Sequence, residues 1–82
     1  MDMHIKVLGP GCSNCQTLKS LVKDAVQTLG IDATVEEVTD YAAIAAYGVM
    51  RTPALVIDDT VFLSGRVPNR DEVRHIIEGL GR

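Results

Sequence analysis

The chain has 82 residues, of which 46% are hydrophobic and 23% charged, and its net charge is −3. This composition predicts one globular domain over residues 1–82 and excludes an intrinsically disordered chain. Charges of both signs are interspersed and no basic face forms, so we expect no nucleic-acid partner. The apolar runs are too short to cross a bilayer and the first residues lack a signal-peptide pattern. We therefore expect a cytoplasmic protein without a membrane partner.

The first half of the chain predicts two strands that alternate with two helices. Residues 5–7 alternate within an apolar run, as in a strand. Residues 13–29 carry apolar side chains at helical spacing, and Gly30 is a common residue after a helix end. Residues 34–38 are rich in β-branched side chains, and their paired glutamates favour a place near the sheet edge. Asp40 can then cap a short helix.

The second half predicts a hairpin and a last helix. Residues 54–57 form a continuous apolar run, typical of a strand buried on both faces. A short turn at Asp58 and Asp59 leads to a return strand over residues 60–63. Asn69 and Glu72 have the spacing of a capping box. The apolar stripe after them has helical spacing: Val73, Ile76, Ile77 and Leu80.

The predicted order β-α-β-α-β-β-α indicates an α/β fold. Two helices join parallel strands, and a hairpin completes the sheet. We expect a four-stranded mixed sheet with helices on both faces.

Cys12 and Cys15 are the only cysteines, and they follow a Gly9-Pro10-Gly11 turn where the first strand gives way to the first helix. Free backbone N–H groups and the positive end of the helix dipole favour a thiolate there. Such a pair can carry out dithiol–disulfide exchange or bind a soft metal ion. A structural zinc site needs four ligands, and only His4 and His75 could join the pair, so we expect no such site.

Two further segments accompany the cysteines. Thr52-Pro53 stands directly before the buried strand, and residues 65–68 (Gly-Arg-Val-Pro) follow the hairpin. A proline belongs at the boundary of a central strand because it cannot donate to the ladder. With the sequence Cys12-Ser13-Asn14-Cys15 and the element order, these segments resemble the thioredoxin superfamily. More narrowly, the chain is similar to the small redox-active disulfide proteins of glutaredoxin size, over essentially its whole length.

The resemblance implies a role for each matching residue. Cys12 would be the exposed nucleophile that attacks a partner disulfide, and Cys15 would be the more buried thiol that resolves the mixed disulfide. Pro53, in its cis form, would lie against the cysteine pair and leave the Thr52 backbone free to bind an extended substrate segment. Gly65 would let that segment approach closely.

The implied function is a thiol–disulfide oxidoreductase that reduces disulfides of partner proteins. The Cys12–Cys15 redox-active disulfide would serve in place of a bound cofactor, and a thioredoxin-reductase-like donor would supply electrons to the monomeric protein. Arg51 and Arg66 are candidates for stabilising the thiolate because both flank the predicted site.

The alternative function is a carrier of Cu(I) or Hg(II) that uses the same two thiolates. Such carriers follow the order β-α-β-β-α-β and lack a Thr-Pro opposite the cysteines, which favours the redox function here. The chain also departs from larger thioredoxins. No tryptophan precedes Cys12, and the first strand offers no carboxylate to take a proton from Cys15.

Overall fold

A computed structural model describes residues 3–11 and 13–80 of the chain. The elements follow the predicted order, with bounds close to those expected. They are β1 (Met3–Leu8), α1 (Ser13–Leu29), β2 (Ala33–Val38), α2 (Tyr41–Ala46), β3 (Ala54–Ile57), β4 (Thr60–Ser64) and α3 (Arg70–Leu80). The predicted α/β element order is therefore confirmed.

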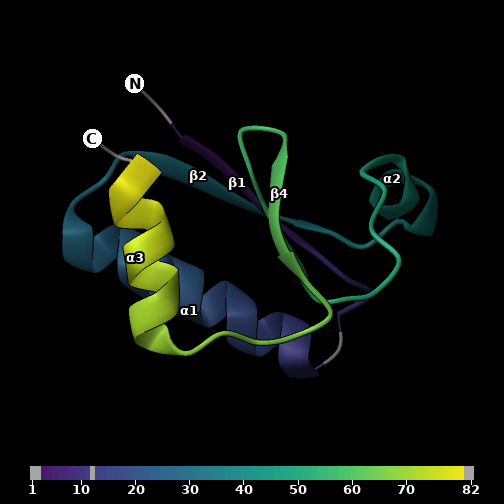
Figure 1. Ribbon diagram of the computed structural model, residues 1–82, viewed down its shortest axis with the longest axis horizontal. Helices are drawn as coiled ribbons and strands as arrows, with labels where there is room; N and C mark the ends of the chain where they lie inside the picture. Colours follow the sequence, from purple (N-terminus) through teal and green to yellow (C-terminus); the bar gives the residue numbers. More distant parts are fainter. Residues whose placement is uncertain (1–2, 12, 81–82) are drawn as a thin grey trace.

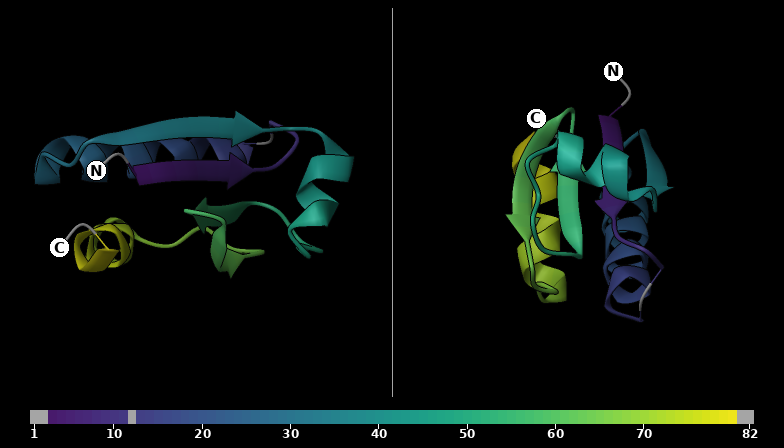
Figure 2. Two further views of the ribbon diagram at one scale, coloured as in Figure 1. Left: turned by 90° about the horizontal axis from the view of Figure 1, so that it is seen from above. Right: turned by 90° about the vertical axis from the view of Figure 1, so that its right-hand side faces the viewer.

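The four strands form one mixed sheet in the order β2-β1-β3-β4. β1 and β2 run parallel, and their arrows point the same way, toward α2, in the left view of Figure 2. β3 is antiparallel to both β1 and β4. The predicted edge position of β2 is confirmed. Because Leu8 pairs with Ala54 and Ala54 with Ser64, the end of β1, the start of β3 and the end of β4 lie together.

One face of the sheet is covered by α1 and α3. The side chains of β1 alternate between the two faces, and Met3, Ile5 and Val7 point into this core. The helices contribute apolar side chains at helical spacing: Leu18, Val22, Ala25, Val73 and Ile77. Figure 1 shows α1 and α3 on the same side of the strands, and the two helices are in contact.

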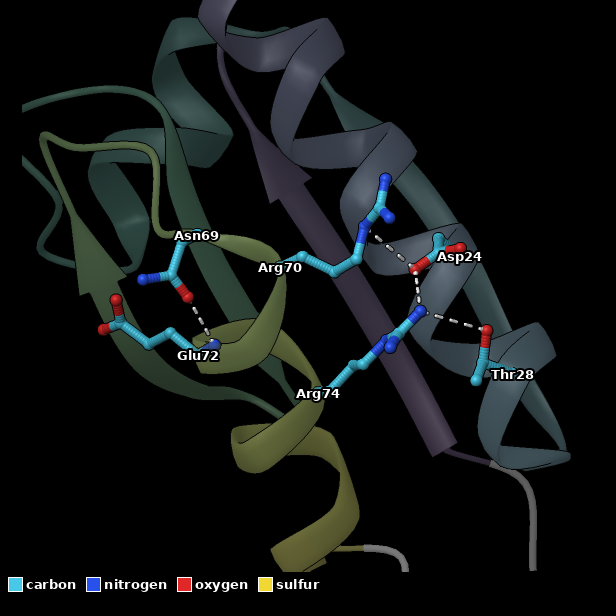
Figure 3. A network of polar contacts seen from close by, with 6 residues as sticks. All are labelled: Asp24, Thr28, Asn69, Arg70, Glu72 and Arg74. Atoms are coloured by element: carbon cyan, nitrogen blue, oxygen red, sulfur yellow. Dashed lines mark hydrogen bonds and ion pairs between the residues drawn. The ribbon is translucent and has the colours of Figure 1, made fainter.

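A small polar network joins α1 to α3 at the rim of this core. Asp24 of α1 accepts a hydrogen bond from Arg74 at 3.0 Å and lies 3.7 Å from the Arg70 guanidinium (Figure 3). Thr28 lies 3.5 Å from the same Arg74 nitrogen. Because the network is partly exposed, it contributes little to stability, and its main effect is to orient α1 relative to α3.

The other face is covered by α2 alone. Ile44 of α2 packs with Leu8, Ala54 and Val56 in a second, smaller core. Asp40 caps α2 as predicted, since its carboxylate accepts a hydrogen bond from the Ala43 N–H at 3.1 Å. Within the described ranges, no helix has both the length and the apolar character that crossing a membrane requires.

The start of α3 corrects part of the sequence analysis. Asn69 caps the helix, because its side-chain oxygen accepts a hydrogen bond from the Glu72 N–H at 2.8 Å (Figure 3). The Glu72 carboxylate, which a capping box would direct back to the start of the helix, binds Arg66 instead. A charged hydrogen bond to a guanidinium is stronger than one to a neutral backbone amide, which explains the difference.

Candidate functional site

The cysteine pair stands at the junction of β1 and α1. Cys12 lies outside the residues that the structure describes. Cys15 is the third residue of α1 and is fully buried, whereas Ser13 and Asn14 are exposed. The first-turn N–H groups of a helix have no partner within it, and the helix dipole is positive at this end, so both features stabilise a nearby thiolate.

Gly9 forms the wall against which the Cys15 thiol packs. A Cβ atom placed on Gly9 would lie 2.2 Å from Cys15 Sγ and 3.3 Å from Cys15 Cβ. The same point lies 3.6 Å from Thr52 Cβ. The Gly9 N–H donates a hydrogen bond to the Val38 carbonyl at 2.9 Å, and this bond fixes the Gly9 backbone relative to β2. Because glycine has no side chain at this position, Cys15 and Thr52 can both approach the Gly9 backbone.

Sequence analysis did not single out Gly9. Its place is that of a turn residue, and turns favour glycine for their own conformation. The signal that could have found it is position: it directly follows a buried strand and precedes the cysteine pair. The structure shows that the requirement is close approach of the backbone to a thiol.

The Thr52-Pro53 segment and Gly65 lie at this same end of the sheet. The Thr52–Pro53 peptide bond is cis, Pro53 is buried and Thr52 is half-buried. The Pro53 carbonyl accepts a hydrogen bond from the Gly65 N–H at 2.9 Å. Gly65 has a φ of 78°, in the left-handed region that favours glycine. The start of β3 and the end of β4 lie beside the end of β1, because Ala54 pairs with both Leu8 and Ser64.

The two candidate arginines have different surroundings. The Arg66 guanidinium donates two hydrogen bonds to the Glu72 carboxylate, one of them at 3.0 Å. These bonds lower the pKa of Glu72 below its ordinary value and raise the pKa of Arg66. The Arg51 stem instead lies over Gly65, with its Cβ 3.1 Å from where a Gly65 Cβ would stand. A role for either arginine in stabilising the Cys12 thiolate stays a prediction.

A hollow lies beside β1 and the turn between β3 and β4. It has a volume of about 340 Å³ and is lined by His4, Lys6, Asp58 and Asp59. His4 and Lys6 precede Leu8, the last residue of β1, by four and two residues, so the hollow does not include the cysteine junction that follows Leu8. It is therefore distinct from the candidate site.

Comparison with known proteins identifies the family. The family model described as "Thioredoxin domain" matches residues 3–78. The chain belongs to the thioredoxin family. One curated relative, a thioredoxin of Methanothermobacter thermautotrophicus, is 36% identical over 75 residues, which cover 92% of this chain and 97% of that one. A thioredoxin of Methanocaldococcus jannaschii is 39% identical over 70 residues, covering 85% of this chain and 80% of the relative.

Solved structures of the family have the same fold. A mutant thioredoxin from Halobacterium salinarum superposes with a TM-score of 0.75 at 24% identity, covering 99% of this chain and 76% of that one. The germline-specific thioredoxin Deadhead from Drosophila melanogaster gives 0.71 at 15% identity, covering 96% and 81%. At these identities the structures establish the fold, while the two curated relatives support a thiol–disulfide oxidoreductase role for the family member described here.

Proposed function

We propose that the protein reduces disulfides of partner proteins through Cys12 and Cys15. The observation that carries the proposal is the surroundings of Cys15. Its thiol is buried in the first turn of α1, against Gly9 and beside Thr52, and Cys15 lies three residues after Cys12 in the sequence. A buried thiol about one helical turn from a second thiol is suited to an intramolecular second step, because no large partner can reach the buried one.

The proposed reaction has two exchanges. The Cys12 thiolate attacks one sulfur of the partner disulfide, a mixed disulfide forms, and the other partner sulfur leaves as a thiolate and takes up a proton. Cys15, as its thiolate, then attacks the Cys12 sulfur and releases the second partner thiol. Two electrons pass to the partner and the protein is left with a Cys12–Cys15 disulfide. A reductase of the thioredoxin-reductase type would restore the dithiol.

The proton of Cys15 needs a route out. Among residues 3–11 and 13–80 no polar or charged side chain is buried, so no buried carboxylate stands under the thiol. We propose that the proton leaves to water at the exposed turn beside Cys15. The rate of the second exchange should then respond to solvent pH directly, without the titration of a buried acid.

Reduction of a protein disulfide such as that of insulin tests this function. The wild-type protein, supplied with a dithiol donor, should turn over, and the Cys12→Ser and Cys15→Ser variants should not. Ser20→Ala, on the exposed side of α1, is the control that should retain turnover. The same preparations are offered Cu(I) and Hg(II). Stoichiometric metal uptake without any turnover would favour the alternative function, a soft-metal carrier.

A further inference from the structure

Met50 and Arg51 form an exposed surface directly before Thr52. Met50 is 97% exposed, more than any other large hydrophobic residue that the structure describes. Arg51 is also exposed, but its stem is held. Its Cβ and Cδ lie 3.1 and 3.2 Å from the point where a Gly65 Cβ would stand. Since Gly65 is itself bonded to the Pro53 carbonyl, the stem is anchored to the candidate substrate-binding segment.

The positive charge of Arg51 is not neutralised within the part of the chain that the structure describes, where no hydrogen bond or ion pair engages it. Carboxylates of the surrounding elements are already engaged. Glu72 binds Arg66, Glu37 lies against Gln16 and Lys19, and Asp40 caps α2. In a chain of net charge −3, this leaves a local positive charge at the site.

We propose that Arg51, together with Met50, selects partner disulfides that have a carboxylate beside the reacting cysteine. This inference rests on the proposed function and adds the class of partner to it. A guanidinium binds a carboxylate through two parallel hydrogen bonds, and the held stem reduces the entropy lost when it does so. Met50 supplies a flexible apolar contact that adapts to different partner backbones.

Three disulfide-linked peptides test the proposal. They are identical except for the residue before the cysteine, which is Glu, Gln or Lys, and kcat/KM is measured for each with the full-length protein. The variants are Arg51→Gln, which removes the charge, and Arg51→Lys, which keeps it. Lys23→Gln is the control for net charge, because Lys23 is exposed on α1 about 12 Å along the helix from Cys15.

The wild-type protein should prefer the Glu peptide to the Gln peptide by about two- to fivefold at low salt, the range that exposed ion pairs give. The preference should shrink near 1 M salt, where the screening length falls to about 3 Å. Arg51→Gln should abolish it, Arg51→Lys should retain only the part that depends on charge, and Lys23→Gln should retain it. Equal rates with the Glu and Lys peptides would overturn the proposal, and so would a uniform loss with all three in Arg51→Gln, which indicates thiolate stabilisation. If the wild-type protein reduces no peptide at all, the proposed function itself has failed.

Discussion

Replacing Gly9 by alanine tests whether the connection from β1 to α1 holds the Cys15 thiol in its place. The new methyl group would stand 2.2 Å from Cys15 Sγ. Non-bonded heavy atoms are at their optimum near 3.5 Å or beyond, so the overlap is roughly 1.3 Å. Cys15 Cβ is also near, at 3.3 Å, and Gly9 itself is tied to Val38. The sulfur must therefore swing to another rotamer, or the backbone must shift.

The cost follows from overpacking a buried site. Forced rotamer changes and backbone shifts in a packed core cost about 1–3 kcal/mol. In a domain of this size each kcal/mol lowers the melting temperature by about 4–8 °C. The chemical effect is separate from the stability effect. In the proposed mechanism a displaced Cys15 sulfur should attack the mixed disulfide more slowly, and the first exchange at Cys12 should be left intact.

Two assays follow the two effects, with Gly79→Ala as the matched control. Gly79 lies in α3 with no neighbour within 4 Å of an added Cβ, so alanine there should leave stability unchanged or raise it by up to about 1 kcal/mol. In urea unfolding, Gly9→Ala should be less stable than the wild-type protein, whereas Gly79→Ala should not. Mass spectrometry during turnover should show Gly9→Ala accumulating the mixed disulfide. Wild-type stability together with wild-type turnover in Gly9→Ala would show that Gly9 does not hold the Cys15 thiol in place.

Three further predictions concern the supporting contacts. Gly65→Ala places a side chain at a φ of 78° and 3.1 Å from Arg51 Cβ, and should cost about 1–2 kcal/mol; an unchanged urea midpoint would contradict it. Glu72→Gln should be less stable than the wild type at neutral pH. Because Arg66 holds the folded pKa of Glu72 below 4.5, this deficit should be full above pH 4.5 and fade as the pH falls through the folded value; a deficit independent of pH would count against the ion pair. Asp24→Asn weakens the contact of α1 with α3, and thermal unfolding should show a loss below about 1 kcal/mol, since the pairs are partly exposed; a larger loss would mean that the network is a main support of the fold.

Much of the fold could be predicted because local patterns and the core agree. Residues 13–29 and 54–57 have the predicted bounds in the structure, and in both the apolar spacing matches the buried face. β4 is the weaker case. It gains an extra residue through a bulge opposite Leu55 and Val56, which leaves Phe62 partly exposed. A bulge depends on pairing with a neighbouring strand, and no pattern within residues 60–64 announces it.

The candidate site could be predicted as a set of segments but not as contacts. Cys15, Thr52 and Gly65 are far apart in the chain, and the fold brings both Cys15 and Thr52 within 4 Å of the point where a Gly9 Cβ would stand. The hydrogen-bond partner of Arg66 could not be predicted from the sequence either. Glu72 has a local role available at the helix start, and only the path of residues 65–69 shows that it binds the guanidinium instead.

In the proposed mechanism Cys12 attacks the partner disulfide and Cys15 resolves the mixed disulfide. This mechanism is tested most directly by mass spectrometry of the Cys15→Ser and Cys12→Ser variants, each mixed in reduced form with an excess of a peptide disulfide. We predict that Cys15→Ser gains one peptide mass, located on Cys12, and that Cys12→Ser gains none, because its remaining thiol is buried against Gly9. A stable adduct on Cys15 in the Cys12→Ser variant, with none on Cys12 in the other, would contradict the account.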